Sequence, residues 1–217
     1  MKVDLRGKLQ LMAAEFFGTA MLATSVLVIS NMFGPGTGPW YTALSAGATL
    51  MLIVGLFGHV SGAHVNPAVT VGMWTLKKIS TEKAVLYIVV QFLGAAIALT
   101  LYNYVTGERV LSVGSSTFEW PVFVAEMVGA ALFGMGIVAA LAQKLEGFYF
   151  AFVIGASLTI GALMSSLASG GYINPAVALG NNAWDKTLAI APIVGMVIGM
   201  NVYHYLFAVD PKRSARK

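Results

Sequence analysis

Long apolar segments alternate with short polar ones along the whole chain. The apolar segments lie near residues 9–30, 40–59, 84–105, 121–142, 148–167 and 187–208. A helix of about 20 apolar residues crosses the hydrocarbon core of a bilayer, so the pattern predicts six transmembrane helices. Two further apolar segments, after residues 66 and 174, are only about ten residues long and too short to cross. We expect these two to be half-helices that enter the membrane and stop there.

The composition supports a membrane protein. Hydrophobic residues make up 58% of the chain and charged residues 10%, whereas soluble domains carry about 25% charged residues. No linker divides residues 1–217, so we expect a single all-α transmembrane domain. The sequence has no cysteine and three scattered histidines. Because no nucleophile–base pair or metal cluster can be built from them, we expect neither an enzyme nor a cofactor.

A nine-residue frame occurs twice, at residues 61–69 and 169–177. Both copies begin with Ser-Gly and end with Asn-Pro-Ala-Val. Asn is a strong N-cap and Pro is favoured in the first helical turn, so each motif predicts a helix start. Glu15 in the first span is matched by Glu126 in the fourth. The duplication therefore divides the chain into two repeats, at about 9–106 and 119–208, followed by a basic tail at 210–217.

The positive charges predict the topology. Of the 13 Lys and Arg residues, only Arg109 and Lys186 fall in connections on one side of the expected membrane. The positive-inside rule makes the other side cytoplasmic. Both termini are then cytoplasmic, in the plasma (inner) membrane, and the second three-span repeat is inverted relative to the first. The net charge of +4 thus reflects orientation, and we expect no nucleic-acid partner. The residues on the cytoplasmic side are Lys2, Arg6, Lys8, Lys77, Lys78, Lys83, Lys144, Lys212, Arg213, Arg216 and Lys217.

The inverted repeat brings the two half-helices together near the midplane of the membrane. Their facing N-termini place positive partial charge there, which repels cations and admits neutral molecules. The side-chain amides of the two motif asparagines can donate hydrogen bonds to a passing oxygen, and the unwound segments before them leave carbonyls free to accept. The predicted pore centre consists of Asn66, Pro67, Ala68, Asn174, Pro175 and Ala176. The predicted pore carbonyls belong to Gly62, Ala63, His64, Val65, Gly170, Tyr172 and Ile173.

With six spans, paired Asn-Pro-Ala motifs and a Glu in spans one and four, the chain resembles the aquaporin and glycerol-facilitator (major intrinsic protein) family. The resemblance covers essentially the whole sequence. It implies a right-handed helical bundle, one pore per subunit and a homotetramer. It also implies that Glu15 and Glu126 support the re-entrant loops by accepting hydrogen bonds from backbone N–H groups.

The chain departs from the family where an arginine normally follows the second motif. Val177 occupies that position. By the same resemblance, the outer constriction would consist of Ala46, Ala162, Gly171 and Val177. In the family that the chain resembles, water channels have Phe, His, a small residue and Arg at these positions, and glycerol channels have Trp, Gly, Phe and Arg. A shift of one residue would bring in Ser45 or Gly47, and Gly161 or Leu163. Unless another side chain fills the gap, we expect a wide, apolar outer constriction.

The leading hypothesis is a passive channel for water and/or small neutral solutes. The alternative is a structural or assembly membrane protein that keeps the fold but conducts little. An alternating-access transporter is disfavoured, because the sequence offers no buried cation site or charge pair beyond the two glutamates.

Overall fold

Six long helices form the body of the protein. The computed structural model describes residues 5–33 and 38–208, and within these ranges each long helix is apolar enough to cross a membrane. The six predicted spans are therefore confirmed, with boundaries that shift by a few residues. The helices are α1 (Leu5–Met32), α2 (Gly38–Ser61), α4 (Thr81–Thr106), α5 (Trp120–Ala142), α6 (Gly147–Ser165) and α8 (Lys186–Leu206).

Two short helices begin at the Asn-Pro-Ala motifs. In both α3 (Pro67–Thr75) and α7 (Pro175–Gly180), the motif asparagine is the N-cap and proline the first helical residue. Helix α3 has nine residues, close to the predicted length, but α7 has only six. It ends early because the chain turns at Asn182, whose φ of 53° is left-handed. Asparagine adopts this conformation more readily than most residues and commonly follows a helix C-terminus.

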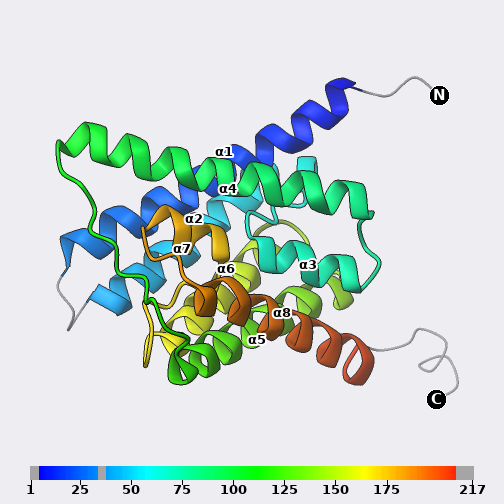
Figure 1. Ribbon diagram of the computed structural model, residues 1–217. Coiled ribbons are helices and arrows are strands. Elements are labelled where there is room, and N and C mark those ends of the chain that lie inside the picture. Colours follow the sequence, from blue (N-terminus) through cyan, green and yellow to red (C-terminus); the bar gives the residue numbers. More distant parts are fainter. Residues whose placement is uncertain (1–4, 34–37, 209–217) are drawn as a thin grey trace, which may run out of the picture.

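The helices form two three-helix groups that pack against each other. Helix α1 lies against α2 and α4, α5 lies against α6 and α8, and contacts between α2 and α6 join the groups. The half-helices lie towards opposite ends of the bundle (Figure 1). Each packs across the repeat boundary, α3 mainly on α8 and α7 mainly on α4. The loops that precede them therefore meet inside the protein.

Helix contacts in the second repeat are close because two glycines face a neighbouring backbone. A Cβ atom on Gly195 or Gly199 of α8 would collide with the carbonyl oxygens of Met127 or Ala131 on α5. Small residues four apart let two membrane helices approach in this way.

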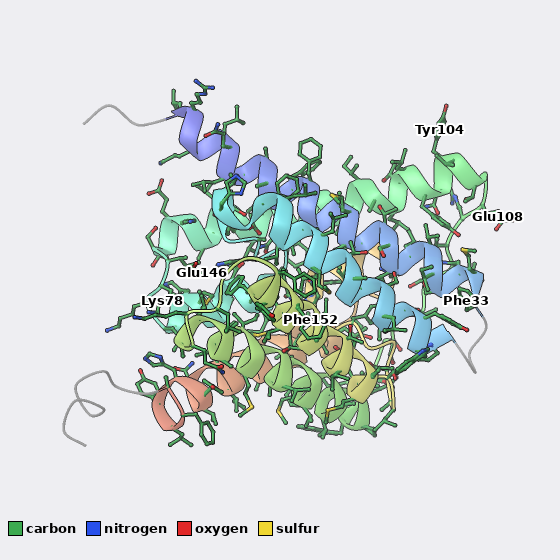
Figure 2. All side chains as sticks on the ribbon, turned by 180° about the vertical axis from the view of Figure 1, so that it is seen from behind. Phe33, Lys78, Tyr104, Glu108, Glu146 and Phe152 are labelled. Carbon is green, nitrogen blue, oxygen red and sulfur yellow. The ribbon has the colours of Figure 1, made fainter. Side chains whose placement is uncertain are left out.

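The charged side chains that lie near the helix termini are found at the two ends of the bundle. Lys78 and Glu146 lie at one end, and Phe33 and Glu108 at the other (Figure 2). An ion pair of 2.6 Å between Lys8 and Glu82 places the start of α1 beside the start of α4. The end that carries Lys78 has further positive residues near its helix termini: Arg6, Lys77, Lys83 and Lys144. The remaining positive residues of that predicted side, Lys2 and the basic tail 210–217, lie outside the described residues.

Candidate functional site

The two motif asparagines bind each other's loops at the centre of the bundle. The Nδ2 atom of Asn66 donates to the Ile173 carbonyl, and that of Asn174 donates to the Val65 carbonyl, each at 3.0 Å. Their Oδ1 atoms cap the half-helices by accepting from the backbone N–H groups of Ala68 and Ala176. One N–H of each amide thus has no acceptor among the described residues, and it is available to a molecule in the pore.

The residues before the asparagines have an unusual backbone. Val65 and Ile173 adopt φ values of 42° and 40°, which are rare for β-branched side chains and cost on the order of 1–3 kcal/mol each. Both residues are held by hydrogen bonds to their own N–H group and to their own carbonyl group. The N–H of Val65 or Ile173 donates to a buried glutamate, and the carbonyl accepts from the opposite asparagine. This double attachment fixes the loops in place.

Glu15 anchors the first loop. It is fully buried and accepts from the backbone N–H groups of His64 and Val65 at 2.9 and 2.7 Å. It also accepts from the Ser61 hydroxyl and from Nε2 of Gln91, both at 2.7 Å. Four donors therefore converge on one carboxylate, which offsets much of the cost of burying it.

Glu126 anchors the second loop with one donor fewer. It accepts from the backbone N–H groups of Tyr172 and Ile173 at 2.9 and 2.6 Å, and from the Ser169 hydroxyl in a short hydrogen bond. It is also fully buried. Both glutamates therefore make the loop contacts that the resemblance implied for them.

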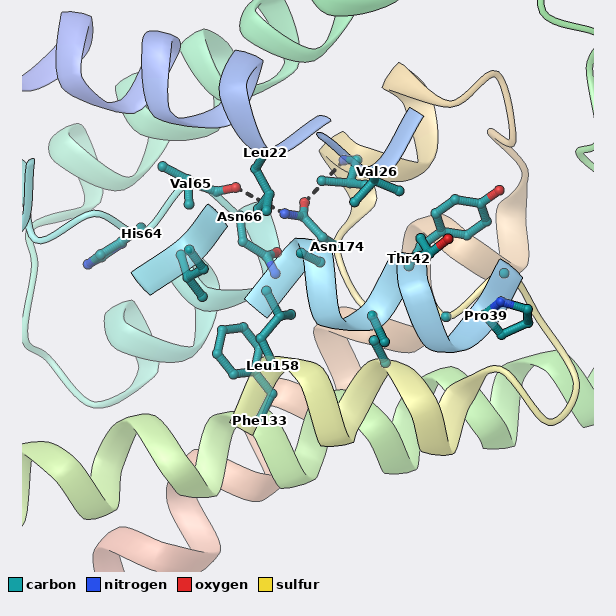
Figure 3. A pocket seen from close by; sticks show the side chains of 18 residues that line it. Leu22, Val26, Pro39, Thr42, His64, Val65, Asn66, Phe133, Leu158 and Asn174 are labelled. Atoms are coloured by element: carbon teal, nitrogen blue, oxygen red, sulfur yellow. Dashed lines mark hydrogen bonds between the residues drawn. The ribbon is translucent and has the colours of Figure 1, made fainter. Parts of the chain in front are cut away.

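Three cavities follow one another through the bundle. The inner cavity is lined by α2, α3, α5, α6 and the first loop, and it shares Leu50, His64 and Phe133 with the central passage. The central passage shares Thr42 and Tyr172, among others, with the outer vestibule. In Figure 3, His64 lies on one side of the paired asparagines, and Thr42 and Pro39 lie on the other. The shared linings place the three cavities next to one another in a row across the bundle.

The predicted constriction residues Ala46, Ala162, Gly171 and Val177 all line the central passage. Gly171 is required there by its backbone, because its φ is 69° and a Cβ atom would lie 2.5 Å from the Ala162 carbonyl oxygen. The central passage that contains these four residues has less free space than the inner cavity. The centre of a water-sized sphere fits in a volume of only about 20 Å³, against about 220 Å³ in the inner cavity.

Side chains that the sequence reasoning missed line the passage beside the asparagine pair. Leu22 lies on one side of the asparagine pair, and Leu158 and Phe133 on the other (Figure 3). The duplication could have identified them, because Leu22 follows Glu15 by the same seven residues as Phe133 follows Glu126. The complete set of lining residues outside the predicted ones is Leu22, Val26, Pro39, Thr42, Ala43, Leu50, Phe133 and Leu158.

The other predicted site residues fall into two groups. Gly62 and Ala63 line the inner cavity with His64, and Val65, Gly170 and Tyr172 line the central passage. Ile173 is fully buried and contributes its carbonyl to Asn66. The second group is buried in the half-helices behind the lining, where it shapes the helix starts without contacting the described cavities. Its members are Pro67, Ala68, Pro175 and Ala176.

This arrangement agrees with comparisons to known proteins. The profile of the family described as Major intrinsic protein matches residues 3–203. The chain belongs to the major intrinsic protein family. Members of this family are passive membrane channels and not enzymes, and the protein is accordingly a multi-pass integral membrane protein.

Two curated relatives and one solved structure illustrate the similarity. Aquaporin AqpM of Methanothermobacter marburgensis is 28% identical over 88% of this chain and 91% of its own length. Aquaporin Z of Photorhabdus laumondii is 29% identical over 92% of this chain and 98% of its own. The structure of the aquaglyceroporin from Plasmodium falciparum matches with a TM-score of 0.71 at 18% identity, over 92% of this chain and 96% of that one. The structural match shows that the two chains share the same fold over nearly their whole lengths.

Proposed function

We propose that this member of the major intrinsic protein family conducts water and small neutral solutes through a narrow, largely apolar central passage. The observation that carries the proposal is the row of three adjoining cavities, with Asn66 and Asn174 lining the middle one. Only Thr42, His64, Asn66, Tyr172 and Asn174 among the passage residues have polar side chains.

Ion exclusion in this proposal rests on the half-helices. The N-termini of α3 and α7 direct partial positive charge at the asparagine pair, which opposes cations and hydronium. Val177 supplies no charge at the position where the family normally has an arginine, so one electrostatic barrier is missing. An apolar ring also favours dewetting, which slows water. We therefore expect a water flux lower than that of a channel with a polar ring, together with weaker proton exclusion.

The test is a vesicle assay. The purified chain is reconstituted into liposomes, and shrinkage is followed by light scattering after osmotic challenge with an impermeant sugar, glycerol or urea. Empty vesicles give the baseline, and imposed pH gradients report proton leak. Water flux clearly above the baseline supports the channel. Flux equal to that of empty vesicles for every solute would instead favour the structural or assembly role.

We also propose the homotetramer that the family resemblance implies, together with the cytoplasmic termini and the plasma (inner) membrane location predicted above. Cross-linking in native membranes tests the tetramer. Protease access to tags at the two ends, in sealed inside-out vesicles, tests the orientation.

A further inference from the structure

The second loop differs from the first in what its ring side chain contacts. His64 and Tyr172 both lie two residues before their motif asparagine. Nδ1 of His64 lies 3.2 Å from the Thr70 hydroxyl, with which it shares a hydrogen bond. The residue that corresponds to Thr70 in the second repeat is Ala178, which offers no hydroxyl. Among the described residues the Tyr172 hydroxyl accordingly has no hydrogen-bond partner.

A second hydroxyl without a partner lines the same part of the path. Thr42 on α2 is only 9% exposed, and its hydroxyl makes no hydrogen bond within the described residues. Helical threonines commonly bond to a carbonyl of the preceding turn, as Thr19 does to Glu15, but Thr42 does not. Asn181 Oδ1 is the one fully enclosed side-chain polar atom without a partner among the described residues. The Thr42 hydroxyl is therefore open to the cavities that it lines, where a molecule in the passage can supply its partner.

Thr42 and Tyr172 both line the central passage and the outer vestibule. Gly170 makes this position possible for the tyrosine, because a Cβ atom there would lie 2.5 Å from Cε2 of the Tyr172 ring and 2.9 Å from its hydroxyl oxygen. The other side chains shared by the passage and the vestibule are apolar: Val26 and Pro39. Between the outer vestibule and the asparagine pair, these two hydroxyls are therefore the polar side chains of the described lining.

We propose that Thr42 and Tyr172 form the solute-recognition site of the outer half of the pore, resting on the proposed channel function. Their two hydroxyls replace the hydrogen bonds that a small neutral solute with hydroxyl or amide groups loses as it leaves water. A hydroxyl both donates and accepts, so this pair favours water, small polyols and amides, and gives no fixed charge to an ion.

The first test is Tyr172→Phe, measured in reconstituted vesicles with water, glycerol and urea as probes. The recognition site predicts that permeability falls, because the passage loses a hydrogen bond that is worth roughly two- to tenfold. Simple obstruction by the hydroxyl predicts the opposite sign, because phenylalanine is smaller and the passage is narrow. The matched control is Tyr104→Phe, which removes a hydroxyl from a side chain that is 85% exposed and should change nothing.

The second test uses the helix side of the site. Thr42→Val keeps the shape of the side chain but removes the hydroxyl, and it should lower glycerol and urea permeability by a similar factor. Thr42→Ser keeps the hydroxyl and should retain the flux. Unfolding temperatures of all variants, measured in detergent, exclude misfolding as the cause of a loss.

The outcomes separate this site from the function on which it rests. No flux above empty vesicles for the unmodified chain overturns the channel, and the recognition site with it. Flux in the unmodified chain with unchanged or increased permeability in Tyr172→Phe and Thr42→Val leaves the channel standing and overturns the recognition site.

Discussion

The two loops that carry the Asn-Pro-Ala motifs share a backbone but differ in their surroundings. In both, a serine and two backbone N–H groups bind a buried glutamate, and a strained β-branched residue presents its carbonyl to the opposite asparagine. The first loop adds a side-chain network through Gln91, Thr70 and His64. The second loop has no counterpart of that network among the described residues.

The polar groups of the two loops therefore differ in how they are bonded. The polar groups of the first loop are mostly bonded within the protein, so they fix its shape. The Tyr87 hydroxyl adds a further hydrogen bond to this loop by donating to the Ser61 carbonyl at 2.8 Å. The second loop is anchored by fewer bonds, and its Tyr172, whose hydroxyl has no hydrogen-bond partner among the described residues, lines the central passage and the outer vestibule. The duplicated framework thus has symmetric scaffolding, whereas the ring side chains that line the cavities differ between the two loops.

The largest expected effect concerns the anchors. Glu15→Ala leaves four donors without an acceptor and Glu126→Ala leaves three, at about 1–3 kcal/mol for each buried donor. Both variants should unfold at lower temperature than the unmodified protein, and Glu15→Ala should be the less stable of the two. Thermal unfolding in detergent measures the order.

The control for this pair is Glu82→Ala, which removes an exposed carboxylate whose one ion pair is with Lys8. Its unfolding temperature should stay within error of the unmodified protein, since solvent screens such pairs. Equal stability of the Glu15 and Glu126 variants would contradict the asymmetry between the loops.

The next effect concerns the asparagine pair, where the halves are equivalent. Asn66→Asp or Asn174→Asp replaces the donating amide by a carboxylate oxygen facing a carbonyl, and it adds negative charge where the half-helix dipoles repel cations. Proton or cation leak should rise, and by similar amounts in the two variants, because their hydrogen bonds are reciprocal. Vesicles with an imposed potential and a pH-sensitive dye measure the leak. Intact folding with no added leak in either variant would remove the asparagine pair from the ion barrier.

Much of this architecture follows from the sequence because it depends on composition and repetition. Six apolar segments and two Asn-Pro pairs determine the spans and the half-helix starts, since bilayer thickness and capping act locally. The early end of α7 was not predicted, because it depends on Asn182 adopting a left-handed conformation in a turn.

The lining of the pore was only partly predictable. A resemblance identifies four constriction positions but gives no information on which neighbouring side chains line the same passage, so Leu22, Phe133 and Leu158 were not predicted. The internal repeat contained part of the answer, because Leu50 and Leu158 each precede their motif asparagine by sixteen residues. Hydrogen-bond partners such as Gln91 depend on how distant helices pack, and no local pattern encodes them.

A smaller effect separates the outer and inner parts of the path. Leu158 lines the narrow central passage, and Ile154, one turn away on α6, lines the larger inner cavity. The narrowest segment dominates the resistance of a pore, so Leu158→Ala should raise glycerol flux relative to water several-fold, whereas Ile154→Ala should leave the ratio unchanged. Both substitutions remove buried aliphatic carbon at a cost of about 2–5 kcal/mol, which matches them for stability. A larger gain in Ile154→Ala would move the constriction to the inner half.

The smallest expected effect is none at all, and it concerns mercurials. These reagents attack thiolates, and the chain contains no cysteine, so water flux through the unmodified protein should be insensitive to them.

Cysteines introduced on either side of the lining then test which residues face the path. Thr42→Cys places a thiol in the wall shared by the central passage and the outer vestibule, and a membrane-impermeant mercurial added from the side of the α4–α5 connection should block it. Ala178→Cys places a thiol at a fully buried position of α7, behind the lining, and should stay unblocked over the same time. Block of the unmodified chain would mean that the reagent acts without a thiol, and block of Ala178→Cys before Thr42→Cys would mean that the second loop faces the path with a different surface.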